Sequence, residues 1–274
     1  MRIRRQLVAA ATGIALLAGA SAPVLAAGDT KSPRPVNGSW EGPFGTFDRA
    51  QLQRGFQVYK EVCSSCHSMN LLHYRNLGER NGPFWDPKYP NANDNPVVKA
   101  IAAQYTIQDM DAEGNEIERP RLPSDRFTAP FESDAIAKQA NGGALPPDLS
   151  VITKARHGGA DYLYSLLTGY NQTPPEGKSI PSGKYYNPYM PGGVIAMSEQ
   201  IPDGRIDYAQ TEANAGIQNT EEQMAKDVAA FLQWAGDPKA TIRKQTGVAV
   251  MAFLAIFAVL LWFTYKSVWR NVEH

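Results

Sequence analysis

Cysteine and net charge are what this 274-residue sequence has little of. It contains two cysteines, and its 27 basic residues balance 27 acidic ones. Two cysteines exclude a disulfide-stapled scaffold, because such folds carry cysteine at a much higher density. A net charge of zero provides no general attraction for nucleic acid, and we expect no nucleic-acid partner. With 23 glycines and 20 prolines, the chain predicts many loops.

The even charge balance hides an apolar stretch near each end. Three arginines in the first five residues precede an apolar run at 7–20, and small residues follow. This order is typical of a secretory signal peptide, because a run of about 14 residues is too short to cross a bilayer. We predict that residues 1–26 are removed, with cleavage after Ala26 or Ala27, and that residues 27–245 are exported.

The second stretch, residues 247–265, has no charge in 19 residues. A helix of that length spans about 30 Å, which is the thickness of the hydrocarbon core of a bilayer. We predict one transmembrane anchor helix at 246–265. The exported domain then lies in the periplasm of a bacterium, the anchor in its inner (cytoplasmic) membrane, and the short tail 266–274 in the cytoplasm.

Acidic residues are unevenly spread over the exported segment, which has 26 of them against 22 basic residues. They gather in two runs, Asp109, Asp111, Glu113, Glu116 and Glu118, then Glu199, Asp203, Asp207, Glu212, Glu221, Glu222 and Asp227. Such runs are typical of a solvated surface. They also suit the electrostatic steering of a basic partner, and both interpretations stay open.

Hydrophobic periodicity predicts three helices, at 47–66, 160–168 and 221–235, with Thr46 or Asp48 as the N-cap of the first. Strand patterns are scarce, and long stretches rich in glycine and proline separate the helices. We therefore expect a mainly α domain with long ordered loops. Loops of that length in a compact domain are usually functional.

Both cysteines lie in one pentapeptide, Cys63-Ser64-Ser65-Cys66-His67. This spacing is the attachment signature of c-type haem. Two thiols one helical turn apart form thioethers to the haem vinyl groups, and the adjacent histidine presents its imidazole to the iron. We therefore predict one covalently attached haem c.

Three other chemistries fit this pentapeptide less well. A redox dithiol needs a surrounding βαβ pattern, which is absent. A disulfide between residues three apart closes too small a loop to stabilise the fold appreciably. A zinc site needs a further pair of ligands, and the sequence has no further cysteine.

The second axial ligand of the iron is not identified by the pentapeptide. Met69 and His73 are too close to His67 in sequence to reach the opposite haem face, and Met224 lies on an apolar helix stripe where core packing is the simpler role. The remaining candidates are His157, Met190 and Met197, with Met110 as a further one. A thioether opposite histidine raises the reduction potential and closes the iron to other ligands, which suits electron transfer.

Several further blocks accompany the haem motif. They read GALPPDLS at 143–150, KARHGG at 154–159, LLTGY at 166–170, and YNPY at 186–189 leading to Met197. With the C-terminal anchor, this combination resembles the cytochrome c1 family, the haem subunits of the quinol:cytochrome c oxidoreductase (bc1) complex. The resemblance covers essentially the whole chain after residue 26.

The resemblance implies a cytochrome c-like haem domain, with His67 and Met197 as the axial ligands and Met190 as a packing residue. It also implies that Leu145, Pro146 and Pro147 line the haem. Lys138 stands where many relatives carry an arginine near a haem propionate, but an ammonium cannot hold a carboxylate with two bonds as a guanidinium does. Arg156 belongs to a matched block, and its partner is not readable from the sequence.

The function implied by the resemblance is single-electron transfer in a respiratory or photosynthetic chain. The haem accepts an electron from the Rieske iron–sulfur protein and passes it to a soluble c-type cytochrome, in a dimeric complex that includes the cytochrome b subunit. Residues 27–245 contain no acid–base or nucleophilic constellation of their own. Quinol oxidation then belongs to the assembly, and this chain is a redox subunit of it.

Two other functions share part of this pattern. Another membrane-anchored monohaem cytochrome has every feature except the blocks after Gly143. A haem-based sensor or a peroxidase needs an open or labile sixth position on the iron, which a stable methionine ligand excludes.

Overall fold

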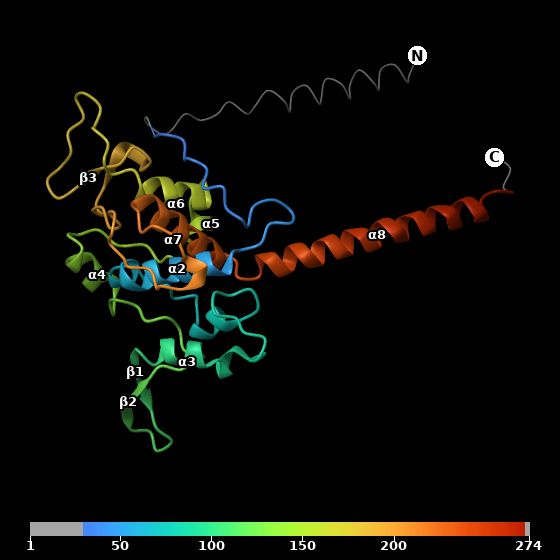
Figure 1. The fold of residues 1–274 in the computed structure, drawn as a ribbon, viewed down its shortest axis with the longest axis horizontal. Helices are drawn as coiled ribbons and strands as arrows, with labels where there is room; N and C mark the ends of the chain where they lie inside the picture. Colours follow the sequence, from blue (N-terminus) through green and yellow to red (C-terminus); the bar gives the residue numbers. More distant parts are fainter. Residues whose placement is uncertain (1–29, 272–274) are drawn as a thin grey trace, which may run out of the picture.

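Helices dominate residues 30–271, the part of the chain that the computed structural model describes (Figure 1). The α-helices are α2 Arg49–Glu61, α3 Pro96–Ala102, α4 Asp134–Ala140, α5 Ile152–Ala155, α6 Gly159–Leu167, α7 Glu221–Gly236 and α8 Ala240–Val268. Short 3-10 helices are η1 Cys63–Ser65, η2 Tyr74–Gly78, η3 Ala92–Asp94, η4 Pro191–Gly193 and η5 Glu212–Asn214. The mainly α prediction is confirmed. The predicted signal peptide, 1–26, lies outside the described residues.

Two small antiparallel sheets complete the described fold. Strands β1 Thr106–Met110 and β2 Glu116–Pro120 form a hairpin, and β3 Tyr185–Tyr186 pairs with β4 Val194–Ile195. The β1–β2 hairpin projects from the lower edge of the molecule in Figure 1. It carries the first acidic run, so that run lies on a protruding hairpin.

The three helices expected from periodicity are present with nearly the predicted bounds. α6 and α7 agree with the prediction to within one residue at each end. α2 begins after Asp48, whose carboxylate accepts a hydrogen bond of 2.7 Å from the amide of Gln51. It ends at Glu61, before the predicted end, because the backbone tightens into η1 at the first cysteine. α3, α4 and α5 were not predicted, because four to seven residues are too few to display a period.

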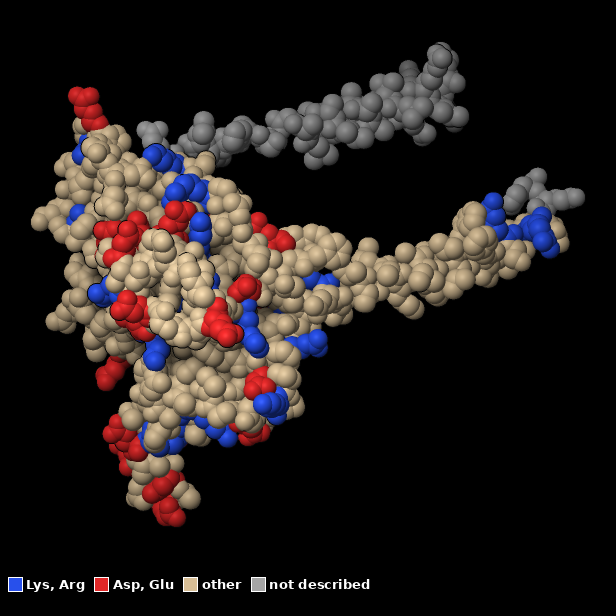
Figure 2. Space-filling view, in the orientation of Figure 1, with Lys and Arg blue, Asp and Glu red and all other residues tan. Residues whose placement is uncertain are grey.

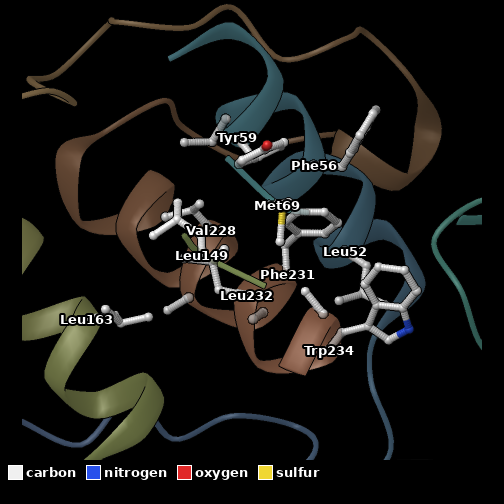
Figure 3. Packing of buried hydrophobic residues seen from close by; sticks show 14 of the residues in the cluster. Leu52, Phe56, Tyr59, Met69, Leu149, Leu163, Val228, Phe231, Leu232 and Trp234 are labelled. Carbon is white, nitrogen blue, oxygen red and sulfur yellow. The ribbon is translucent and has the colours of Figure 1, made fainter. Parts of the chain in front are cut away.

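The core forms where α2 packs against α7, and α7 in turn packs against α6. Gly55 permits the first contact, because a Cβ atom at this position would lie 2.0 Å from the carbonyl oxygen of Asp227. Figure 3 shows Met69 among the aromatic and aliphatic side chains of this core. Met69 and Met224 are both fully buried there, in agreement with a packing role for Met224.

A buried ion pair links the same two helices. Asp227 is 0% exposed and accepts hydrogen bonds from Arg54 at 2.8 and 3.1 Å, from the hydroxyl of Tyr208 at 2.9 Å and from Gln223 at 2.9 Å. The prediction that Asp227 belongs to an acidic surface run is therefore wrong. The residue lies on the face of α7 that meets α2, where its charge is neutralised by Arg54.

α8 is a 29-residue helix, Ala240–Val268, whose most apolar window has a mean hydropathy of 2.4. Within residues 30–271 it is the one helix long and apolar enough to cross a membrane, and the prediction of a single apolar C-terminal helix is confirmed. It extends away from the other helices (Figure 1). Its first turns contact the domain, because Thr241 is buried and the Lys244 ammonium donates a hydrogen bond to the carbonyl of Trp40.

The buried ion pair predicts a large effect on stability. Replacing Asp227→Ala leaves the Arg54 guanidinium buried without its partner, and we expect the free energy of unfolding to fall by about 3–5 kcal/mol. Urea unfolding of the full chain in detergent measures this. The matched control on the same helix is Lys226→Ala, which removes an exposed pair with Glu222 and should cost less than about 1 kcal/mol. Equal losses in the two variants would contradict the prediction.

Candidate functional site

A cavity of about 720 Å³ opens between segments that are far apart in the sequence. Its walls come from the end of α2 and η1, from residues 141–149, from α6, from residues 190–201 and from one face of α7. Most of the lining is apolar. The volume falls within the roughly 300–1,000 Å³ that is usual for small-molecule and cofactor pockets.

Most of the site residues expected from the sequence line this cavity. They are Cys63, Cys66, His67, Leu145, Pro146, Pro147 and Met197. Lys138 is not among the lining residues. It lies on α4, and its side chain is exposed. Arg156, from a block noted in the sequence, does line the cavity.

The cysteine pentapeptide begins where α2 ends. The hydroxyls of the two intervening serines satisfy carbonyl groups of the last helical turn, Ser64 with Lys60 at 2.7 Å and Ser65 with Val62 at 2.8 Å. The backbone then turns within η1, and the amide of His67 donates to the carbonyl of Cys63 at 2.9 Å. This turn places both cysteines and the histidine along the cavity. The sequence analysis assigned no role to the serines, although serine and threonine are known to bond nearby backbone groups.

The imidazole of His67 is oriented by the backbone. Its Nδ1 lies 2.8 Å from the carbonyl oxygen of Pro147, an acceptor, so Nδ1 carries the proton and Nε2 is left with its lone pair. Burial lowers the pKa of His67, although the hydrogen bond to Pro147 opposes this. Burial thus favours the neutral imidazole, and the hydrogen bond to Pro147 selects its tautomer, which is the form that binds a metal.

Asp148 holds the two segments on this wall together. Its carboxylate accepts hydrogen bonds of 2.8 Å from the Ser68 hydroxyl, the Asn70 amide and the Ser150 amide. Burial tends to raise the pKa of Asp148, but these hydrogen bonds outweigh it and the pKa is lowered. The sequence analysis missed this role. The available signal was an aspartate directly after Pro147 and two residues before Ser150, because aspartate side chains commonly bond the backbone two residues on.

The two thiols are free and lie in the lining of the cavity. Burial raises the pKa of the Cys63 thiol to about 12. Cys63 is therefore a neutral thiol at physiological pH, the form that is retained in an apolar environment.

Of the residues weighed as second axial ligand, Met190 and Met197 line the same cavity as His67. His157 is exposed outside the lining, and Met110 is 66% exposed on the β1–β2 hairpin. The two methionines differ in their surroundings. The sulfur of Met190 accepts a hydrogen bond of 3.6 Å from the Tyr162 hydroxyl, whereas within residues 30–271 no side chain or backbone group donates to the sulfur of Met197.

The lining fits a haem. A porphyrin needs an apolar slot, two thiols for its vinyl groups, an imidazole and a thioether for its iron, and a cation for its propionates. The slot supplies Cys63, Cys66, His67 and Met197. Arg156 is the available cation. Within residues 30–271 its guanidinium makes one hydrogen bond, of 3.1 Å, to the adjacent Ala155 carbonyl, which leaves most of its donors for a ligand.

Comparison with known proteins agrees with this fit. Residues 39–272 match the sequence model described as "Cytochrome C1 family". The chain belongs to the cytochrome c1 family. Proteins of this family carry haem c, and the cysteine pentapeptide is consistent with that. Family membership therefore argues against the pentapeptide being a redox dithiol or a zinc site.

Individual cytochrome c1 relatives are similar over most of the chain. "Cytochrome c1" of Blastochloris viridis is 39% identical, with 100% of this chain and 99% of the relative covered. "Cytochrome c1" of Rhodospirillum rubrum is 37% identical, with 99% and 98% covered. "Cytochrome b/c1" of Bradyrhizobium diazoefficiens is 42% identical over 88% of this chain, which spans only 36% of that longer protein.

The depressed pKa of Asp148 predicts a pH-dependent contribution to stability. Since its folded pKa lies below the unfolded value of about 3.9, the carboxylate stabilises the fold above that pH and loses this effect as the pH falls through the folded pKa. Asp148→Asn should lower the unfolding free energy by about 1.5–3 kcal/mol at pH 7. The difference from wild type in urea unfolding should shrink below about pH 4. A difference that stays constant down to pH 3 would contradict this assignment.

Proposed function

We propose that this chain carries one covalent haem c on Cys63 and Cys66, with His67 and Met197 as axial ligands, and transfers single electrons. The observation that supports this most directly is the cavity, which gathers these four side chains in one apolar slot. When bound, the haem supplies a one-electron carrier. The chain's own residues attach it, hold its iron between two ligands and exclude water from its faces.

The proposed ligand pair fits the surrounding geometry. Pro147 holds the His67 ring in the tautomer that leaves Nε2 for the iron. Met197 is the methionine whose sulfur accepts no hydrogen bond from the described residues, while Tyr162 engages Met190. Arg156 takes the role of propionate partner in this proposal, in place of Lys138, because it is Arg156 that borders the cavity.

The proposed setting is the bc1 complex of a bacterial inner membrane. α8 spans the membrane once, the haem domain lies in the periplasm, and residues 266–274 lie in the cytoplasm. The proposed partners are the cytochrome b subunit, the Rieske protein as electron donor and a soluble c-type cytochrome as acceptor. Relatives from Candida albicans and Bradyrhizobium diazoefficiens, named "Cytochrome b-c1 complex catalytic subunit, mitochondrial" and "Cytochrome b/c1", support this setting.

The acidic β1–β2 hairpin would attract a basic electron acceptor. Figure 2 shows acidic side chains gathered over the β1–β2 hairpin, at the lower edge of the view. Asp109 is paired with Arg119 at 2.6 Å, which also binds Asp125, and Asp111 is hydrogen-bonded within the turn to Asn115. Three acids of the run remain exposed outside any ion pair in residues 30–271. They are Glu113, Glu116 and Glu118.

The axial-ligand proposal predicts a clear difference between the two cavity methionines. Met197→Leu should lower the midpoint potential by about 0.1–0.3 V, part of the roughly 0.8 V range that axial ligands cover, and should let the reduced protein bind CO. Met190→Leu, the matched control, should leave the iron closed. Redox titration and CO difference spectra of the full chain in detergent measure both effects.

Two results would overturn the ligand assignment. One is a Met197→Leu protein with the wild-type potential and no CO binding, together with a changed Met190→Leu protein. The other is a wild-type reduced protein that already binds CO at neutral pH, which would instead favour a sensor or a peroxidase.

The steering proposal predicts an effect on the rate of electron transfer to a basic soluble cytochrome c. Replacing Glu113, Glu116 and Glu118 with glutamine should lower the second-order rate on the order of threefold to tenfold at low salt, within the range of electrostatic steering. The dependence of the rate on ionic strength should also flatten. Stopped-flow mixing at several salt concentrations measures both.

The control removes the same charge elsewhere. Neutralising the exposed acids Glu41, Asp94 and Glu212 alters the net charge equally without changing the hairpin. If both triple variants slow the reaction alike, net charge rather than the hairpin steers the partner. If neither does, the acidic run is simply a solvated surface.

A further inference from the structure

Asn187 is a fully buried polar residue at the base of the loop that carries Met190 and Met197. It is 0% exposed and directly follows β3. Its side-chain nitrogen donates to the carbonyl of Leu166 at 2.7 Å, and its side-chain oxygen accepts from the amide of Tyr189 at 3.1 Å. Burying an amide is unfavourable unless it is hydrogen-bonded, and both ends of this amide are.

The backbone of Asn187 is bonded within the same loop. Its amide donates to the carbonyl of Gly193 at 3.1 Å, and its carbonyl accepts from the amide of Met190 at 3.1 Å. Gly193 precedes β4, and Met197 follows β4 by two residues. One residue therefore closes the loop on itself and joins it to a helix at the same point.

That helix is α6, which forms a wall of the cavity. Leu166 lies in the last turn of α6, where carbonyl groups lack the regular helical partner. Its carbonyl also accepts a longer hydrogen bond, of 3.4 Å, from the Gly169 amide. Leu166 also lines the cavity. The hydrogen bond from Asn187 therefore connects the methionine loop directly to a wall of the slot in which the haem would lie.

Gly169 makes this contact possible. A Cβ atom at Gly169 would lie 2.9 Å from the side-chain oxygen of Asn187 and 2.8 Å from the ring of Tyr189. The Ser165 carbonyl oxygen of α6 would also lie 2.9 Å away, so a larger residue at Gly169 would force the loop and the end of α6 apart. The absence of a side chain at Gly169 and the amide at Asn187 thus act on the same contact.

We propose that Asn187 is the positioning residue that holds the Met197 loop against α6, so that the thioether stays within reach of the iron. The inference rests on the proposed function, since it concerns a ligand to the haem. Asn187 itself does not touch the haem in this proposal. Without its amide, the loop is no longer fixed to α6, and the methionine ligand is released more readily.

The test compares two buried asparagines that differ in what they hold. Asn95 is 1% exposed, and its amide donates to the Phe84 carbonyl at 2.7 Å and accepts from the Val97 amide at 2.9 Å. It lies at the start of α3 and is not among the residues that line the cavity. The Asn95 side chain also accepts a longer hydrogen bond, of 3.3 Å, from the Val98 amide. Asn95→Ala therefore removes at least as many hydrogen bonds of a buried side-chain amide, with no connection to the methionine loop.

We expect Asn187→Ala to weaken methionine ligation specifically. At the wild-type midpoint potential, the ratio of reduced to oxidised haem should fall about tenfold, which corresponds to roughly 59 mV, and the reduced protein should bind CO. Asn95→Ala should lower the thermal unfolding temperature about as much as Asn187→Ala does. The Asn95→Ala protein should nevertheless keep the wild-type midpoint potential, and its reduced haem should not bind CO. Equal potentials and equal CO binding in the two variants would overturn the proposal.

Two further variants keep the result decisive. If Asn187→Ala yields no folded protein, Gly169→Ala displaces the same contact and should lower the potential in the same direction; an unchanged potential there overturns the proposal. Met197→Leu, measured alongside, separates the two levels of inference. If Met197→Leu changes neither the midpoint potential nor CO binding, the ligand assignment is wrong. If Met197→Leu changes them and Asn187→Ala does not, only the positioning role of Asn187 is wrong.

Discussion

The close approach of α2 and α7 at Gly55 determines the geometry of the whole haem domain. Because Gly55 has no side chain, the backbone of α7 at Asp227 can lie directly against α2, and the neighbouring Arg54 reaches the Asp227 carboxylate. α2 leads at its C-terminal end into the two cysteines, while α7 contributes Val228 and Leu232 to the lining of the same cavity. The contact that builds the core thus also holds two parts of the cavity wall together.

Outside these helices, side chains bonded to backbone groups fix the path of the chain. Asp148 joins the segment after the pentapeptide to the segment that holds Pro147, and Asn187 joins the methionine loop to α6. Each bond connects residues that are about 20 to 80 positions apart. The described chain has one pair of five-residue strands and one pair of two-residue strands, so few strand ladders order its loops. Single buried polar residues fix the loops instead.

This division explains what could be predicted from the sequence. α2, α6 and α7 could be predicted because each repeats an apolar pattern over two or more turns, and α8 because its uncharged run is long enough to cross a bilayer. The pentapeptide carried the signature of haem c attachment. Asp227 could not be recognised as buried, because its role depends on Arg54 at a distance of 173 residues. The choice between Arg156 and Lys138 likewise depends on which one borders the cavity, and spacing along the chain does not encode that. Asn187 lies in the YNPY block that resembles the cytochrome c1 family, but its proposed positioning role depends on its hydrogen bond to Leu166, which the sequence does not show.

The distribution of charge separates attraction from electron transfer. The cavity lining is mostly apolar, and within the described chain Arg156 is the one lysine or arginine in it. The exposed glutamates of the β1–β2 hairpin lie on another element, and Arg119 neutralises part of the same run. A low-dielectric slot would make any nearby charge act strongly on the proposed haem iron, whereas charges in water are screened within about 10 Å. In the proposed function, acids on a protruding hairpin can therefore attract a basic partner while the reduction potential is set by the proposed ligands His67 and Met197 and the groups that hold them.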